Sequence, residues 1–209
     1  MKKELNKDFT IRRETEKDYF NTENLVRESF WNVYKPGCAE HFVLHVLRDR
    51  PDFIGDLDFV MEKDGKLIGQ VVFVKSHIDL TSGEKFPIAT FGPIGIAPEY
   101  KRQGYGAALL SYAMEQAEKQ GIGALAICGN ELFYGTLGFK KAKDFGICYA
   151  DDPEADYFLI KELIPGFLNG INGSYSDPKE YFVSDDDVEE FDKQFPPKQK
   201  LRLPGQLFN

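Results

Sequence analysis

The chain has 209 residues, of which 42% are hydrophobic and 29% are charged, and these values are ordinary for a globular protein with a full core. The formal net charge of −8 argues against nucleic acid as the main partner, because phosphate neutralisation requires a basic surface. The polar N-terminal residues do not resemble a secretion signal and no apolar run could span a membrane, so we expect a cytoplasmic protein without a membrane partner.

The first eighty residues are predicted to form a strand, two helices and a hairpin. Thr15 and Asp18 are typical helix caps, and Asp64-Gly65 is a typical hairpin turn. Alternating apolar residues and β-branched residues favour strands on both sides of that turn. In chain order, we expect a strand over Phe9–Arg13, helices over about 18–31 and 39–48, and hairpin strands over 57–62 and 67–80.

A further strand is predicted over Phe86–Ile96, and Gly92-Pro93 interrupts it. An interior Gly-Pro marks a bulge or an edge where pairing stops. A glycine-rich loop then leads directly into a helix. Gly104 and Gly106 let a ligand approach the main chain, while the N–H groups of the first helical turn point outward at the positive end of the helix dipole. This layout suits a phosphate or a pyrophosphate.

The helix after the loop carries one apolar face and ends at Gly121. A short apolar run, Gly123–Cys128, predicts a buried strand, and Tyr157–Ile164 predicts another. Strand, loop, helix, strand and helix in this order predict a mixed α/β domain. The helix residues predicted to be core are Gly106, Leu109, Leu110, Ala113, Met114 and Ala117.

Two common phosphate-binding patterns do not fit the loop. A dinucleotide fingerprint that starts at Gly104 would need Gly or Ala at position 109, which is Leu109, and no Walker A sequence is present. The segment Lys101–Gly106 (K-R-Q-G-Y-G) instead resembles the coenzyme A pyrophosphate loop of the GNAT acetyltransferase superfamily, with Lys101 where the family prefers Arg or Gln. Tyr134–Phe139 (Y-G-T-L-G-F) resembles the family's Tyr-x-x-x-Gly-Phe signature. Two ordered motifs are a much rarer coincidence than either alone.

The resemblance covers roughly residues 9–150 and implies a fold class. This class is the mixed α/β GNAT-like acyl-CoA N-acyltransferase fold, in which a splayed mixed central sheet is flanked by helices. We place the splay at Gly92-Pro93. The expected domain organisation is a core over residues 1–150 and a C-terminal extension over residues 151–209 that packs on the core.

The resemblance also implies a cosubstrate, acetyl-CoA. In the family, the strand before the loop hydrogen-bonds the pantetheine arm, and an N–H at about Ile96 would polarise the thioester carbonyl. The Tyr of the second motif lies beside the thioester sulfur in the family, so we predict that Tyr134 is the general acid for the leaving thiolate. The residues predicted to bind the cosubstrate are Ile94, Gly95, Ile96, Lys101, Arg102, Gln103, Gly104, Tyr105, Gly106 and Ala107.

The predicted function is transfer of an acetyl group from acetyl-CoA to the primary amine of a small molecule, by direct attack in a ternary complex. A protein or peptide acceptor is an alternative, since the same core serves both. A non-catalytic acyl-CoA sensor is an alternative of another class, and the presence of Tyr134 favours an enzyme.

The general base is not identified by the sequence. His77, Asp79 and Glu84 are better explained as solvated turn residues, and Asn130 as the cap of a short helix. We expect no metal site. The three cysteines form no zinc or disulfide pattern, and the pair His41 and His45, one helical turn apart, lacks an evident third ligand.

Aromatic residues mark two further regions. Phe20, Phe30, Trp31 and Tyr34 are candidates for an acceptor-pocket wall, but core packing is the preferred explanation. In the tail, the acidic run Asp185–Glu190 could cap a helix or attract a cation, and a solvated face is preferred. The tail residues Phe191, Phe195 and Phe208 indicate packing on their own domain or on a second subunit, so a homodimer is possible.

Overall fold

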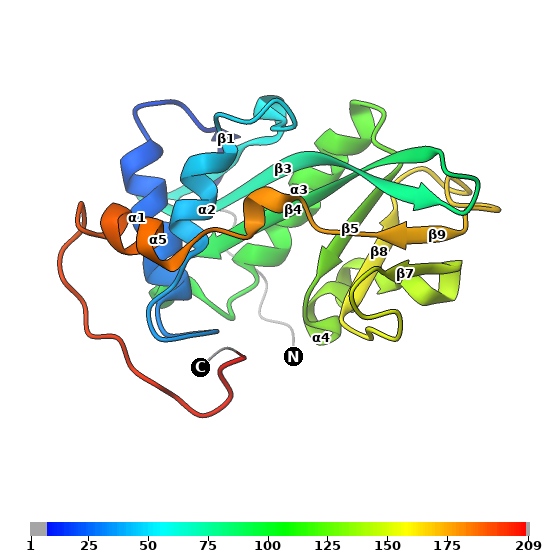
Figure 1. Ribbon diagram of the computed structural model, residues 1–209. Coiled ribbons are helices and arrows are strands. Elements are labelled where there is room, and N and C mark those ends of the chain that lie inside the picture. The colour runs from blue at the N-terminus through cyan, green and yellow to red at the C-terminus, as the bar shows by residue number, and fades with distance from the viewer. Residues whose placement is uncertain (1–7, 208–209) are drawn as a thin grey trace. The chain divides into compact units, whose positions relative to one another are not determined.

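The computed structural model describes residues 8–207 and has a mixed sheet flanked by helices (Figure 1). These residues divide into two compact units. The first combines 8–72, 92–110 and 179–207, and the second combines 73–91 and 111–178. Three elements contribute residues to both units: β3 (Lys66–Leu80), β4 (Lys85–Ile96) and α3 (Tyr105–Lys119).

The sheet of the first unit begins with an antiparallel β1-β2-β3 order. β1 (Thr10–Arg13) pairs with β2 (Phe59–Lys63), and β2 pairs with β3 through the hairpin predicted at Asp64-Gly65. Both turn residues have positive φ, +50° for Asp64 and +74° for Gly65. Such a pair of left-handed residues matches the twist of a two-residue hairpin.

Three helices of the first unit pack together (Figure 1). They are α1 (Tyr19–Phe30), α2 (Glu40–Leu47) and α5 (Asp185–Asp192). The acidic run therefore lies within α5. Ser184 caps the N-terminus of this helix, and the three aspartates of its first turn interact favourably with the helix dipole. Phe191 and Phe195 are buried and contact His41 of α2, so the tail packs on its own chain. Phe208 lies outside the described residues.

The sheet of the second unit combines parallel and antiparallel pairs. β4 pairs with β5 (Ala124–Cys128) in parallel, and β8 (Phe158–Glu162) lies antiparallel between β5 and β6 (Lys140–Lys141). β7 (Ile147–Tyr149) pairs with β9 (Gly173–Tyr175), which also pairs with β3. The short helix α4 (Glu131–Tyr134) follows β5. The buried core of this unit includes Ile78, Ile88, Ala126, Phe158, Ile160 and Tyr175.

The mixed α/β class and the longer predicted elements are confirmed, with bounds that differ by a few residues. On α3, Leu109, Leu110, Ala113, Met114 and Ala117 are buried as predicted. The register between β4 and β5 ends at Thr90↔Ala126, before Gly92-Pro93, where we expected pairing to stop. β4 itself continues through that peptide, which is cis. The sequence did not predict β6, β7 and β9, which have two or three residues each and carry no periodicity.

We expected the aromatic residues near α1 to pack in the core, and this expectation is wrong for two of them. Phe20 is 53% exposed and Tyr34 is 42% exposed. Phe20 stacks on Phe195 with ring centroids 5.1 Å apart, and the backbone carbonyl of Tyr34 accepts a hydrogen bond from Leu207 N–H. Both residues therefore meet the C-terminal segment, which the helical periodicity of α1 could not reveal. Within residues 8–207, no helix combines the length and the apolar character needed to cross a bilayer.

Candidate functional site

The loop before α3 has the backbone geometry of an anion-binding turn. Arg102 has φ of +58° and Gly104 has φ of +95°, so left-handed residues alternate with other conformations just before the helix begins at Tyr105. Such alternation turns successive N–H groups toward one side. The first N–H groups of α3 have no partner within the helix, because the chain before them is not helical. The loop can therefore present several donors to one anionic group at the positive end of the α3 dipole.

The side chains of this loop are held by neighbouring carbonyls of the first unit. Lys101 Nζ donates to the carbonyl oxygen of Ser29 at the end of α1, and burial lowers the pKa of Lys101, with Arg102 adding a smaller effect. Gln103 Nε2 donates to Glu99 O at 2.7 Å. The Arg102 side chain is exposed. In this arrangement Lys101 anchors the loop to α1.

The end of β4 lies against α1. A Cβ atom at Gly95 would be 3.2 Å from Ser29 Oγ and 3.3 Å from a methyl carbon of Val26, so the missing side chain allows the helix to approach the strand. Ser29 Oγ donates to Ile96 O at 2.8 Å. Ile94 and Ile96 are half-buried. The structure thus brings the predicted pantetheine strand and the predicted loop to the same turn of α1.

Tyr134 lies in the second unit, at the end of α4. Its ring packs against Phe91 and Phe139, with ring centroids 5.8 Å and 5.6 Å away. A Cβ atom at Gly129 would be only 2.3 Å from a ring carbon of Tyr134, so Gly129 leaves the space that the ring occupies. Asn130 caps α4 by accepting a hydrogen bond from Leu132 N–H, which confirms the capping explanation. Tyr134 therefore has a defined, half-buried position.

The histidines have separate carboxylate partners. His77 Nε2 lies 3.4 Å from Asp79 Oδ1 on the exposed strand end, and His45 Nδ1 lies 2.9 Å from Glu23 Oε1. His41 is fully buried, and its Nε2 lies 3.1 Å from Asp192 Oδ1. Burial lowers the pKa of His41 to about 4, which keeps the ring neutral. Across residues 8–207, no group of three or more His, Cys, Asp or Glu side chains converges on a point where a metal ion could bind.

A buried charged cluster in the first unit was not anticipated from the sequence. Arg48 donates to Glu14 at 2.9 Å and to Glu23 at 2.6 Å, and all three side chains are almost completely buried. Burial, followed by a hydrogen bond with Glu14, raises the pKa of Asp58 to about 9. The charges are mutually paired, so we assign this cluster to the stability of the unit.

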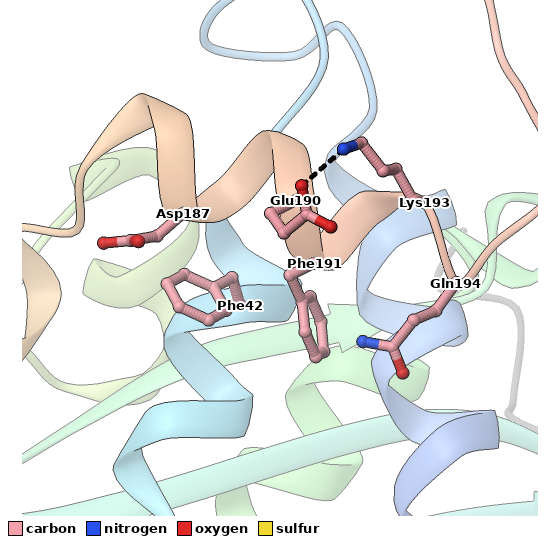
Figure 2. Close-up of a pocket in the computed structure, with 6 residues that line it drawn as sticks. All are labelled: Phe42, Asp187, Glu190, Phe191, Lys193 and Gln194. Carbon is pink, nitrogen blue, oxygen red and sulfur yellow. Dashed lines mark hydrogen bonds and ion pairs between the residues drawn. The ribbon is translucent and has the colours of Figure 1, made fainter.

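A shallow hollow with a volume of about 490 Å³ is lined by Phe42 of α2 and by residues in and just after α5. Figure 2 shows these side chains. Phe42 and Phe191 supply its aromatic surface, and Glu190 forms an ion pair with Lys193 at its edge. None of its lining residues is a predicted site residue. The hollow results from the packing of α2 against α5. Its charged residues Glu190 and Lys193 already pair with each other.

Ser29 and Tyr181 contact the predicted cosubstrate strand but were not identified from the sequence. Tyr181 Oη donates to Gly92 O at 2.8 Å. The contacts join residues that are 67 and 89 positions apart in the chain, with no local motif around either one. Only the folded structure reveals them.

Comparison with known families places a domain on the chain. Residues 56–141, which include β4, the loop and Tyr134, match the family model of the acetyltransferase (GNAT) domain. No curated protein matches the sequence significantly.

Solved structures share the fold. The chain is similar to YhbS, a GNAT family N-acetyltransferase from Escherichia coli in complex with CoA, with a TM-score of 0.73 and 23% identity over 84% of this chain and 93% of that chain. A GNAT family acetyltransferase from Brucella melitensis, in complex with acetyl-CoA, gives a TM-score of 0.65 and 20% identity over 83% and 97%. The ribosomal-protein-S18-alanine N-acetyltransferase from Escherichia coli gives 0.51 and 18% over 75% and 94%.

Proposed function

Because the chain carries a GNAT N-acetyltransferase domain, we propose that it transfers the acetyl group of acetyl-CoA to the primary amine of a small molecule. The amine attacks the thioester directly in a ternary complex. The nitrogen forms a bond to the carbonyl carbon, the carbon–sulfur bond breaks, and CoA leaves as a thiolate that takes up a proton.

The observation that carries the proposal is the loop geometry. Positive φ at Arg102 and Gly104, just before the first turn of α3, creates a set of convergent N–H donors that fits a diphosphate. The similar structures from Escherichia coli and Brucella melitensis contain CoA and acetyl-CoA respectively. Both facts support acetyl-CoA as the donor for this chain.

We assign the two ends of the cosubstrate to two segments of the first unit. The diphosphate is held by the loop Lys101–Ala107, mainly through backbone N–H groups. Since Lys101 Nζ bonds the carbonyl of Ser29, we assign the exposed side chain of Arg102 as the cation that interacts with the diphosphate. The pantetheine arm extends along Ile94–Ile96, and the Ile96 N–H polarises the thioester carbonyl as it becomes an oxyanion.

Tyr134 is the proposed general acid that protonates the thiolate. A thiol with an ordinary pKa near 8.5 is a fair leaving group that benefits from a hydrogen bond. An amine with a pKa near 10.4 must also lose a proton during attack. Over the whole reaction, the proton that the amine loses balances the proton that the thiolate takes up.

The direct test of the donor is thermal unfolding with acetyl-CoA, with CoA, ATP and NAD as controls. At about one hundred times Kd, a ligand of the native state adds roughly 2.7 kcal/mol, which should raise the midpoint by about 5 to 10 °C. A shift with acetyl-CoA and CoA alone is the expected result. Absence of any shift at saturating acetyl-CoA would refute the proposed donor.

The test of catalysis is Tyr134→Phe, with Tyr157→Phe as the matched control. Amine-dependent thiol release should fall on the order of 10²–10⁴-fold in the Tyr134 variant, while CoA binding is retained. The Tyr157 ring is 45% exposed, and its variant should keep full turnover. Binding without turnover of any amine or peptide by the wild-type protein would favour the acyl-CoA sensor instead.

A further inference from the structure

Asp177 of the second unit is a carboxylate held in place by neutral donors. Tyr149 Oη of β7 donates to Asp177 Oδ2 at 3.0 Å, and Tyr175 Oη of β9 donates to Asp177 Oδ1 at 3.0 Å. Cys128, the last residue of β5, lies beside the same carboxylate, and the pKa of its thiol is raised by burial first and then by the charge of Asp177. Two phenols therefore fix both oxygens of the carboxylate.

No cation of the described chain balances the charge of Asp177. Within residues 8–207, its carboxylate contacts phenols and a thiol, and no Lys, Arg or His side chain pairs with it. Asp156 of the same unit, by contrast, pairs with Lys141 at 3.0 Å and with Lys143 at 2.8 Å. Charges removed from water are normally paired, and Asp177 is half-buried. This position therefore favours a cation supplied by a ligand.

The surroundings of Asp177 suit an organic ammonium group. The Tyr149 ring is half-buried and lies 5.7 Å from the ring of Phe158 and 6.3 Å from that of Tyr175, measured between centroids. Aromatic faces attract organic cations. An ionised carboxylate accepts about four hydrogen bonds, so the two phenols leave room for donors from a ligand. A metal ion would need several ligating side chains, and the described residues bring no three together.

Asp177 and the proposed acid Tyr134 belong to opposite faces of the sheet. Cys128, which lies beside Asp177, packs in the same core cluster as Ile88 of β4. Phe91 is three positions after Ile88, so its side chain points to the other face of the strand, and there it packs against the Tyr134 ring. A ligand bound at Asp177 would therefore not compete with Tyr134 for space.

We propose that Asp177 binds the positively charged amine of the acceptor, and that Tyr149 and Tyr175 hold its carboxylate in position. Asp177 is thus an acceptor-binding residue beside the carboxyl end of β5. The acceptor that it selects is a cationic amine, and a neutral or anionic molecule of the same shape binds less well. This inference rests on the proposed function, because it assigns the site to the acceptor of acetyl transfer.

The test compares three probes that share one carbon skeleton and differ in charge: phenethylamine, phenethyl alcohol and hydrocinnamate. Isothermal titration is carried out without CoA and with saturating CoA, which allows no acetyl transfer. Hydrogen bonds to charged groups are worth roughly tenfold in affinity or more, so wild-type protein should bind the amine at least about tenfold more tightly than the alcohol. Hydrocinnamate should bind most weakly. In Asp177→Asn, the affinities for amine and alcohol should agree within about threefold.

Asp156→Asn is the matched control, because Asp156 lies in the same unit and already pairs with two lysines. It should leave the ratio of the amine and alcohol Kd values unchanged. A partly unfolded variant lowers the amount of active protein but not this ratio, and Asp177→Ser provides a second variant without the carboxylate. The inference would be overturned by an unchanged ratio in both Asp177 variants, or by equal affinity of wild-type protein for amine and alcohol. Failure of wild-type protein to bind CoA would overturn the proposed function instead, and the titrations without CoA would still test Asp177.

Discussion

The loop Lys101–Ala107 and the β4 edge between Gly92 and Ile96 are the two parts of the candidate donor site in the first unit, and they are built in different ways. The loop is local. Its geometry follows from Gly104, Gly106 and the start of α3 within a few residues. The edge depends on Ser29 and Tyr181, which lie 67 and 89 positions away from the carbonyls that they bond.

This difference means that the loop and the β4 edge should respond differently to substitution. A loop that binds through backbone N–H groups needs only certain backbone angles, and glycine adopts these angles without steric cost. The β4 edge is instead bonded by the side chains of Ser29 and Tyr181, which reach it only when the whole unit is folded. We therefore expect changes in the loop to affect any ligand that carries the diphosphate, and changes around the edge to affect only ligands that also carry the pantetheine arm, or to affect stability.

The largest effect is expected for Gly104→Val. Gly104 has φ of +95°, which a β-branched residue adopts only with strain, and the new side chain would also block the approach of a ligand to the backbone. Losing charge-assisted hydrogen bonds of about 1.5–3 kcal/mol each should weaken CoA binding on the order of 100-fold. Isothermal titration with CoA measures this change.

Gly83→Val is the control for backbone strain. Gly83 has φ of +88° in the turn after β3, and nothing lies within 4 Å of its Cβ position. It should lose similar stability and keep full affinity for CoA. If both variants lost affinity equally, the loop would have no specific role in binding.

The second largest effect is expected for Asp192→Asn. Asp192 forms a two-point contact with Arg27, whose side chain is only 1% exposed and stacks on Trp31 at 4.3 Å. Breaking a buried pair leaves an uncompensated charge, and because Asp192 is partly exposed we expect a loss of about 2 kcal/mol in the free energy of unfolding. Urea denaturation measures the loss.

The matched control is Asp185→Asn, which removes an exposed carboxylate on the same helix that pairs with Lys35 at 2.6 Å. Its effect should stay below about 1 kcal/mol. In Asp192→Asn, the segment 179–207 should also become more sensitive to proteolysis. Equal losses in the two variants would show that the Arg27 pair does not hold this segment.

The local part of the site could be predicted from the sequence, and the long-range part could not. The glycine loop and the Tyr134 motif predicted the GNAT domain, the fold class and the enzyme class, and these are confirmed. The assignment of individual donor residues remains a prediction. Contacts such as Tyr181 with Gly92 leave no periodic or motif signal, because their geometry depends on how β4 and the C-terminal segment fold together.

Low pH should weaken the packing of α2 against the C-terminal segment, where His41 contacts Asp192, and should leave the loop Lys101–Ala107 unaffected. His41 is buried with its pKa lowered to about 4, mainly by burial, whereas an unfolded histidine has a pKa near 6.5. The unfolded state therefore binds more protons below pH 6.5, and the stability that His41 contributes above this value is lost as the pH falls toward 4.

Between pH 6.5 and pH 5 this loss should amount to roughly 1–2 kcal/mol, measured by urea denaturation at each pH. His41→Gln should flatten the dependence in this range, although its stability at pH 7 will be lower. A wild-type protein and a His41→Gln variant with the same pH dependence would contradict the assignment of the effect to His41.

The smallest effect is expected for Ser29→Ala, which tests the two parts of the site against each other. Ser29 touches both, because its hydroxyl bonds Ile96 O and its carbonyl accepts from Lys101 Nζ. The substitution removes only the hydroxyl contact, at a cost of about 1 kcal/mol, and should weaken CoA binding by about threefold. A CoA fragment that ends at the diphosphate should bind unchanged, whereas Gly104→Val should weaken both ligands. Ser111→Ala, the same change on the exposed face of α3, is the control. If Ser29→Ala weakened the fragment as much as CoA, the loop and the edge would act as one unit, and the distinction between them would fail.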